Sequence, residues 1–369
     1  MRIVYFTHSL ASCWNHGNAH FLRGVLDDLA SRGHQVCALE PEGAWSLANL
    51  LADHGPEGLE AWRAAYPRLR SRMYRPDEDL AALVGAADLV IVHEWNDPAL
   101  VAGLGRLRAR GAPWLLLFHD THHRAVSAPE EMAAYNLDAY DGVLAFGEAL
   151  SEVYRLRGWG NRVWTWHEAA DTVRFRPPER EQQRKGLVWI GNWGDGERTN
   201  ELEQFLFRPA RATAMPLDIY GVRYPDSALA TLSRYGARYH GWAPNAAAPA
   251  IFARHLATVH VPRRFYVTTL PGIPTIRVFE ALACGIPLVS APWDDAEGLF
   301  TPGADYLVGA DCEAVTRHLF ALRHDPDLRT ELTARGRATI RARHTCAHRV
   351  DELLGIVASL SPAIHGVTA

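Results

Sequence analysis

The sequence predicts an α/β fold with two domains, each built on a parallel sheet. Its 369 residues leave room for about two domains of ~150 residues each. Residues 3–6 form an expected buried strand, 19–31 a helix and 35–39 a second strand, which is the order of a βαβ unit. A crossover helix of this kind makes the two strands parallel. The same alternation begins afresh at 187–190, so the second half is expected to repeat the architecture of the first.

The chain divides into four expected parts. Residues 1–172 form the first domain, and 187–345 form the second. Between them, 173–186 has the composition of a linker, with adjacent prolines and many charges. Two helices are expected within 311–344. A terminal helix is expected in 346–369, because apolar residues recur along it at helical spacing.

Composition and charge favour an ordinary soluble globular protein. The hydrophobic content of 48% and the charged content of 22% are typical of globular proteins. A net charge of -4 gives no support to a nucleic-acid partner. The five cysteines follow no disulfide or metal-binding pattern, which favours the reducing cytoplasm. We expect no signal peptide and no transmembrane segment, while peripheral membrane contact stays open.

The stretch 270–290 organises the second half. Pro271 and Pro274 delay helix formation until Thr275, and Gly285 ends the helix before a strand over 288–290. A loop, a helix N-terminus and a strand beneath them suit a bound anion. Arg277 and Glu280 stand three residues apart on the same side, where they suit phosphates and vicinal hydroxyls. The alternative is a surface helix with one ion pair.

The run 275–290 resembles the donor-site segment of GT-B glycosyltransferases, and most closely that of the CgeB-like branch (glycosyl transferases group 1). The resemblance implies two Rossmann-like domains facing across a cleft, transfer from a nucleotide diphosphate sugar without a cofactor or metal, and a terminal helix that crosses back to the first domain. It also implies that Glu280 binds the ribose of the donor. The family's first glutamate falls at Gly272, so half of that signature is missing.

A glycine-rich loop at 191–199 strengthens the resemblance, since three glycines between a strand and a helix let the backbone close on a ligand. Thr199 is the expected N-cap. The resemblance makes Arg198 the partner of the donor diphosphate, a role that suits its bidentate fork. In the first half, the loop at 15–18 gives a weaker phosphate-loop signal. The predicted donor-binding residues are Gly17, Asn192, Trp193, Arg198, Tyr220, Trp242, Thr275, Ile276, Arg277 and Glu280.

Polar residues follow the strand predicted at 114–118. His119 and Asp120 come directly after it, at the end of the strands where open α/β sheets bind ligands. The histidine resembles one that contacts the donor hexose in retaining GT-B enzymes, so His119, Asp120 and Arg198 are the predicted catalytic residues and retention is the expected outcome. If transfer inverts instead, Asp120, Glu94 or Glu168 could serve as base. A metal site at 119–123 and a plain surface turn are the alternatives, although no second ligand cluster follows at zinc spacing.

Two segments of the first half are less specific. Residues 41–76 are expected to be irregular, with a basic–aromatic patch formed by Trp62, Arg63, Tyr66, Arg68, Arg70, Arg72, Tyr74 and Arg75. The patch could meet an acceptor or an anionic surface, or it could be a solvated edge. At 167–171 the chain resembles the domain-crossing segment of the same branch, and Asp171 is expected to bond backbone there.

Two rival functions share the predicted fold. A sugar-nucleotide 2-epimerase would turn over its donor without an acceptor. A sugar-nucleotide-binding protein that has lost catalysis would bind the donor without transfer or hydrolysis. The fold alone does not choose among these and the transferase.

Overall fold

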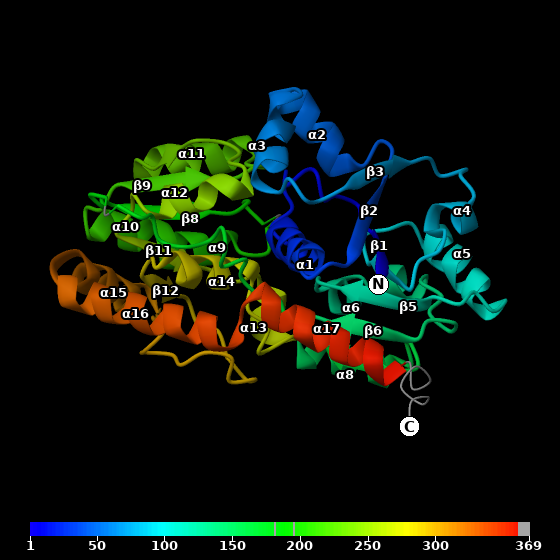
Figure 1. Cartoon of the computed structure of the whole chain (residues 1–369). Coiled ribbons are helices and arrows are strands. Elements are labelled where there is room, and N and C mark those ends of the chain that lie inside the picture. Colours follow the sequence, from blue (N-terminus) through cyan, green and yellow to red (C-terminus); the bar gives the residue numbers. More distant parts are fainter. Residues whose placement is uncertain (181, 195, 361–369) are drawn as a thin grey trace. The chain divides into compact units, whose positions relative to one another are not determined.

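The computed structural model describes residues 1–180, 182–194 and 196–360 (Figure 1). The chain falls into two compact units. Unit 1 contains Met1–Ser12, Phe21–Glu168 and the C-terminal residues from Cys346 on, and unit 2 contains Cys13–His20 and Ala169–Thr345. Three parts of the predicted segments lie outside the described residues: position 181 of the linker, position 195 of the glycine loop, and 361–369 of the terminal part.

Unit 1 is built on a seven-stranded parallel sheet with the order β3-β2-β1-β4-β5-β6-β7. The strands are β1 (Arg2–Phe6), β2 (Gln35–Pro41), β3 (Ser71–Tyr74), β4 (Leu89–His93), β5 (Leu115–Asp120), β6 (Gly142–Ala145) and β7 (Val163–Thr165). The direction of winding reverses between β1 and β4. In doubly wound sheets such a reversal marks the point where ligands bind at the carboxyl ends of the strands.

The helices of unit 1 are α1 (Ala19–Ser31), whose first two residues group with unit 2, α2 (Trp45–His54), α3 (Glu57–Ala65), α4 (Leu80–Val84), α5 (Pro98–Ala109), α6 (Arg124–Ser127), α7 (Pro129–Ala133), α8 (Glu148–Arg157) and α17 (Cys346–Leu360). α17 lies beside α1 (Figure 1), where Arg32 Nη1 is 2.5 Å from Asp351 Oδ1. The expectation that 41–76 is irregular was wrong, because α2, α3 and β3 occupy most of it. Their buried faces are narrow, with Leu50 and Trp62 as main anchors, so the apolar period is weak.

Unit 2 is built on a six-stranded sheet with the order β10-β9-β8-β11-β12-β13, again parallel throughout. The strands are β8 (Leu187–Ile190), β9 (Leu217–Tyr220), β10 (Arg238–Tyr239), β11 (Ala257–His260), β12 (Leu288–Ser290) and β13 (Leu307–Val308). Its helices are α9 (Thr199–Leu202), η1 (Glu203–Phe207, a π-helix), α10 (Arg208–Ala212), α11 (Asp226–Tyr235), η2 (Asn245–Ala247, a 3₁₀ turn), α12 (Ala248–Phe252), α13 (Arg264–Thr268), α14 (Ile276–Cys284), α15 (Cys312–His324) and α16 (Pro326–Arg343). Here the winding reverses between β8 and β11.

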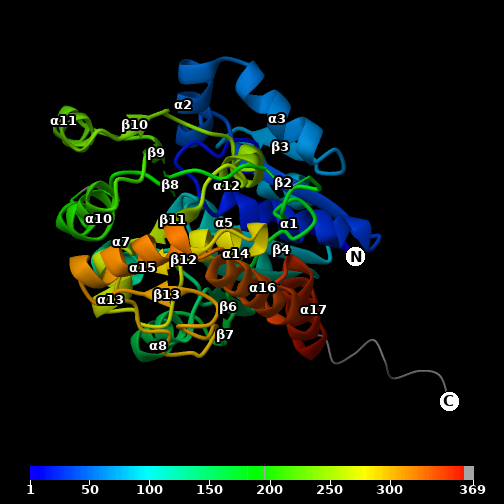
Figure 2. The same ribbon diagram turned by 90° about the vertical axis from the view of Figure 1, so that its left-hand side faces the viewer.

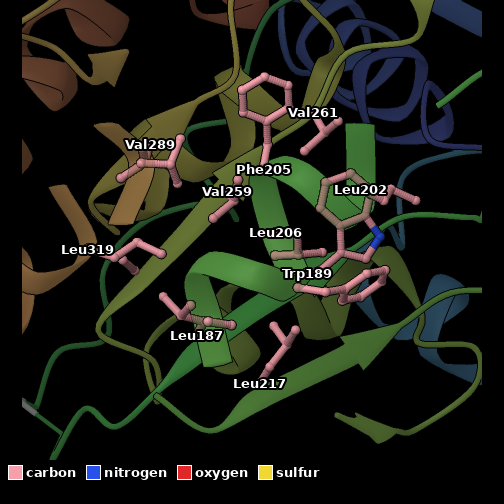
Figure 3. Packing of buried hydrophobic residues seen from close by; sticks show 14 of the residues in the cluster. Leu187, Trp189, Leu202, Phe205, Leu206, Leu217, Val259, Val261, Val289 and Leu319 are labelled. Atoms are coloured by element: carbon pink, nitrogen blue, oxygen red, sulfur yellow. The ribbon is translucent and has the colours of Figure 1, made fainter. Parts of the chain in front are cut away.

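Alternate residues of the unit 2 strands form one hydrophobic core. Leu187, Leu217 and Val259 from three neighbouring strands meet Leu206 and Leu319 from the helices (Figure 3). Figure 2 shows α10 and α11 on one side of β8 and β9, and α12 on the other. Both faces of the sheet are therefore covered, as parallel sheets require.

Two local predictions near β8 and α14 can be compared with the structure. Thr199 is the first helical residue of α9, so the N-cap is Arg198 and the expected cap was wrong by one position. The helix then passes through the π-helical turn η1 before α10. α14 begins one residue after Thr275 and ends at Gly285 with φ +66°, which confirms the predicted helix. No helix among the described residues is long and apolar enough to cross a bilayer.

Candidate active site

A cluster of three arginines lies at the winding reversal of unit 2. Arg198 ends the loop after β8, Arg263 follows β11, and Arg277 stands in the first turn of α14. Loops at a reversal of this kind approach each other at the carboxyl edge of the sheet. Arg198 Nη1 donates a hydrogen bond of 3.1 Å to the carbonyl of Val261, which joins the two loops.

Arg198 is a buried cation held mainly by neutral groups. Its Nη2 donates to both the backbone and side-chain oxygens of Asn192, each at 2.9 Å, and its guanidinium lies 5.0 Å from the Trp189 ring centroid. No carboxylate of the described residues forms an ion pair with it, and its buried Nε has no hydrogen-bond partner there. Burial, together with the charges of Arg263 and Arg277, lowers the pKa of Arg198 to about 10. The group stays charged at neutral pH and lacks a direct counterion, so an anion would be stabilised there.

The other two guanidiniums have carboxylate partners. Arg263 Nη1 is 2.6 Å from Glu197 Oε2, and Arg277 forms an ion pair with Glu280. Arg198 also depends on Gly194, which has φ +93° and whose added Cβ would lie 2.8 Å from Arg198 Nε. Only glycine fits there without displacing the arginine.

Glu280 is fully buried and both of its oxygens have partners. Oε2 accepts from Arg277, and Oε1 is 2.7 Å from His20 Nδ1. The amide of Asp171 donates to His20 Nε2 at 2.7 Å, so the imidazole proton lies on Nδ1 and points to Glu280. Phe175 lies against the His20 ring at 3.6 Å between centroids. The predicted Arg277–Glu280 pair exists. All residues of α14 except Arg277 are buried, so the surface-helix alternative was wrong.

The remaining predicted donor residues fall into different environments. Gly17 packs on Ile276, since an added Cβ would lie 3.2 Å from Ile276 Cγ2. Asn192 Nδ2 donates to Asn15 Oδ1 at 2.7 Å, which joins the 13–20 segment to the glycine loop. The Thr275 side chain makes no cap hydrogen bond.

Of the predicted aromatic residues, Tyr220 stacks on His240 at 4.5 Å and Trp242 is half-buried. Trp193 is placed differently from its prediction. Its indole is 6% exposed and stacks on Phe207 within the hydrophobic core, because its position after β8 continues the inward face of the strand.

Gly272, where the family places its first glutamate, has φ +86°. A Cβ there would lie 3.1 Å from Glu297 Cγ and 3.3 Å from Glu297 Oε1. A glutamate at this position would be strained and would meet another carboxylate. The departure from the family signature is therefore part of the local structure.

A second polar cluster lies at the carboxyl ends of β4 and β5 in unit 1. His119 is the fifth residue of β5, where its Nδ1 forms a hydrogen bond with the Tyr5 hydroxyl. Burial raises the pKa of Tyr5 well above its usual value and lowers that of His119 to about 3, so a phenol meets a neutral imidazole. Nδ1 is the hydrogen-bond partner of the Tyr5 hydroxyl among the described residues, so we assign the phenol as donor and the ring proton to Nε2, which has no partner there. His119 thus offers one unused donor.

Two carboxyl groups lie beside this histidine. Asp120 Oδ2 accepts from the Tyr154 hydroxyl at 2.7 Å, and Glu94 Oε2 is 2.5 Å from Arg124 Nη2. Both carboxyls are fully buried. Burial raises the pKa of each, and the charge of Asp120 raises that of Glu94 further. A pair of this kind holds a proton near neutral pH and can exchange it with a ligand.

The alternatives for unit 1 can also be compared with the structure. His119 and Asp120 are strand residues with 1% and 0% exposure, so the surface-turn interpretation was wrong. Within the described ranges, no three His, Cys, Asp or Glu side chains are grouped to hold a metal ion. Arg68, Arg72 and Arg75 of the basic–aromatic patch pair with Asp27, Glu78 and Asp77, which is the solvated-edge arrangement.

Sequence reasoning missed three site residues: His20, Arg124 and Tyr154. His20 meets a carboxylate 260 positions away, and no local pattern signals that contact. Arg124 follows the polar run 119–123 directly, which was the available signal. The expectation for Asp171 agrees with its bond to the backbone amide of Val173 at 3.2 Å.

Comparison with known proteins gives a family match in part of the chain. Residues 198–355 match the family described as glycosyl transferase-like. No curated protein matches the sequence.

Solved structures match over nearly the whole chain. The T4 phage β-glucosyltransferase is 13% identical with a TM-score of 0.60, covering 98% of this chain and 99% of that one. Sucrose-phosphate synthase from Thermosynechococcus elongatus is 14% identical with a TM-score of 0.66 and the same coverage. An α-glucosyltransferase bound to UDP and a 13-mer DNA is 14% identical with a TM-score of 0.69, covering 97% and 99%.

These matches confirm the GT-B fold, with one parallel α/β sheet in each of two domains. The matched family and the shared fold together support a transferase. The arginine cluster and α14 both lie within the matched residues 198–355.

Proposed function

We propose that this protein transfers a sugar from a nucleotide diphosphate sugar to an acceptor hydroxyl. The observation that carries the proposal is Arg198, a buried guanidinium without a carboxylate partner among the described residues. Burial lowers its pKa, and the charges of two further arginines act in the same direction. A site of this charge favours an anion such as a diphosphate. The similar glucosyltransferase structures were determined with UDP or UDP-glucose. UDP-sugars are therefore the first donors to test.

In the proposed reaction, the bond between the sugar's anomeric carbon and the diphosphate oxygen breaks, and its electron pair stays on that oxygen. Arg198, with Arg277 and the N-terminus of α14, stabilises the growing negative charge. The acceptor oxygen bonds to the anomeric carbon. Its proton passes to the departing phosphate oxygen, which needs no enzymatic base and no metal. Glu280 accepts from the ribose hydroxyls, held in place by His20.

We assign retention of configuration to this reaction, with His119 as donor of a hydrogen bond to the sugar. Its unused Nε2 proton supports this role. The similar structures include an α- and a β-glucosyltransferase, so the fold itself leaves the outcome open. For an inverting reaction Asp120 and Glu94 are the candidate bases, because their raised pKa values suit proton uptake near neutral pH. Proton NMR of the first product distinguishes the two outcomes by its anomeric coupling.

The test begins with a thermal-shift screen of nucleotides and sugar nucleotides. A ligand at 100 times its Kd stabilises a protein by about 2.7 kcal/mol. Transfer is then assayed in EDTA, because the proposed reaction needs no metal. Turnover of donor without acceptor would favour the epimerase, and binding without turnover would favour the inactive binding protein. If no sugar nucleotide binds, the proposal is wrong.

The role of Arg198 gives the sharper test. Arg198→Ala should lower the rate of transfer about 100-fold while donor affinity falls less, because the leaving-group charge grows in the transition state. Arg198→Lys should recover part of the rate, since a point charge cannot bond in bidentate fashion. Arg264→Ala is the matched control: its side chain is 51% exposed, pairs with Glu201 and follows Arg263 directly. Equal rates in all four proteins would exclude Arg198 from the reaction.

A further inference from the structure

Trp95 is the one exposed residue of an otherwise buried polar turn. The turn follows β4, directly at the winding reversal of the unit 1 sheet. Trp95 is 42% exposed, whereas His93, Glu94 and Asn96 are 2%, 0% and 4% exposed. A single exposed aromatic residue is ordinary on a protein surface. Trp95 is unusual in its position, because it lies at the edge where doubly wound sheets bind ligands.

Side chains from several elements hold the turn in one conformation. Asn96 Nδ2 donates to the carbonyls of Phe6 and His93 at 3.0 and 2.8 Å. The Tyr135 hydroxyl lies 3.0 Å from the carbonyl of Asn96, and Arg124 Nη2 donates to the carbonyl of Glu94 at 2.5 Å. The exposed indole is therefore presented on a rigid support, as binding surfaces require.

The surroundings of the indole define the kind of ligand. The Arg124 guanidinium lies 4.0 Å from the ring centroid and covers one face, so the exposed area belongs to the other face and the edge. The rings of His122 and His8 stand 5.1 and 6.2 Å away at 66° and 58°. Glu94, the residue before Trp95, has its Oε1 buried without a hydrogen-bond partner among the described residues. An aromatic face is thus edged by groups that can bond hydroxyls.

The charge balance argues against an anionic ligand here. Arg124 contacts two carboxyl groups, the buried Glu94 and the exposed Glu131 at 3.5 Å, so the cation under the indole is compensated. A phosphate backbone needs uncompensated cations to hold it. A sugar ring needs none: its C–H face packs on the negative face of an indole, while its hydroxyls bond to the edge.

From this geometry we propose that Trp95 is the stacking platform for a hexose ring of the acceptor, with the imidazoles of His8 and His122 at its edge. The inference rests on the proposed function and gives that function an acceptor class: a neutral glycoside. It predicts a binding site in unit 1 that operates without donor.

The experiment labels the whole protein with 5-fluorotryptophan and follows the ¹⁹F NMR signal of Trp95, assigned by its loss in Trp95→Phe. The probes are the methyl α- and β-pyranosides of glucose, galactose and mannose, and a 13-nucleotide single-stranded DNA. Trp45, which is 52% exposed on α2, is the matched control signal. We expect the ¹⁹F chemical shift of Trp95 to change saturably with at least one glycoside, and that of Trp45 to stay constant.

Calorimetry with that glycoside gives the second measurement. Trp95→Ala should weaken binding about tenfold, the loss of one ring contact, whereas Trp95→Phe should weaken it less than about threefold. Three results would each contradict the proposed stacking role of Trp95. They are a chemical-shift change of Trp95 with the DNA alone, an equal change of Trp45, and unchanged affinity in Trp95→Ala. A thermal shift with UDP-glucose on the same sample separates this inference from the proposed function. If UDP-glucose binds but no glycoside changes the Trp95 chemical shift, only the acceptor site is contradicted.

Discussion

At the scale of single residues, burial decides the chemical state of the unit 1 cluster. His119, Glu94 and Asp120 are all at least nine-tenths buried, and each is driven toward its neutral form. For His119 this means an imidazole that donates from Nε2 because Tyr5 donates to Nδ1. A neutral donor fixed in one tautomer suits a hydroxyl ligand better than a cation would.

We expect His119→Ala to lower the rate of transfer about 100-fold while leaving nucleotide affinity unchanged, since the imidazole is assigned to sugar and not to base. Tyr5→Phe is the control variant, because it removes only the group that fixes the tautomer and should cost less. Initial rates and calorimetry with the nucleotide diphosphate measure both effects. A parallel loss of nucleotide affinity would place the histidine elsewhere in the reaction.

The raised pKa of Glu94 also makes stability depend on pH. Between the unfolded pKa near 4.5 and the folded value of about 8, the folded protein binds more protons than the unfolded chain. The free energy of unfolding therefore falls as pH rises through this range. Glu94→Gln removes that titration, so from pH 5 to pH 8.5 the variant should lose about 4 kcal/mol less stability than the unaltered chain.

Urea denaturation at both pH values measures the difference. Glu148→Gln is the control, because the pKa of that half-exposed carboxyl is lowered by Thr165 and Arg155 and should not titrate above pH 5. If the free energy of unfolding changed equally with pH in all three proteins, the pKa of Glu94 would not be raised in the folded state. On the acid side, the lowered pKa of His119 predicts that stability falls as pH drops below about 6.5.

At the scale of elements, α14 shows how far sequence reasoning reaches. Its start after two prolines, its apolar spacing and its αL glycine are local signals, and the helix they predict is observed. Its environment is not local. Glu280 is held by His20 from a segment 260 positions earlier, and that segment groups with unit 2 although it precedes most of unit 1. Only tertiary packing brings these residues together, so no pattern in the sequence announces the pair.

If His20 positions Glu280, its loss should affect ligand binding as well as folding. His20→Ala leaves the Asp171 amide and Glu280 each without one buried partner, which costs about 2–4 kcal/mol of stability. Nucleotide affinity should fall about tenfold along with it. His255→Ala is the matched control, since that buried histidine of unit 2 pairs with Asp218. The control should lose stability and keep its affinity, and an equal affinity loss in both would reduce His20 to a folding role.

At the scale of the whole molecule, the order of elements was the most predictable property. Strand and helix alternation in both halves predicted two parallel sheets, because crossover geometry leaves few other options. What escaped prediction was the 41–76 region, whose helices bury little apolar surface, and the role of Trp193, whose side chain faces the core. Both depend on which face of a helix or strand packs against the core. Short elements contain too few residues to show a period of apolar side chains.

The charge of the chain gives the last prediction: the protein does not bind DNA, although one similar structure holds a 13-mer DNA. Net charge is -4, and three arginines of the basic–aromatic patch are paired with carboxylates. Within that patch, Arg63 and Arg70 are the arginines left to release counterions from a phosphate backbone. Fluorescence anisotropy with a labelled 13-mer at physiological salt should show no saturation up to about 100 µM protein, the weak end of non-specific binding.

The double variant Asp77→Asn, Glu78→Gln frees Arg72 and Arg75 and should bind more tightly, with a steeper loss of affinity as salt rises. Tight, salt-resistant binding by the unaltered chain would show instead that it reads DNA through contacts other than charge, and would make nucleic acid a candidate acceptor.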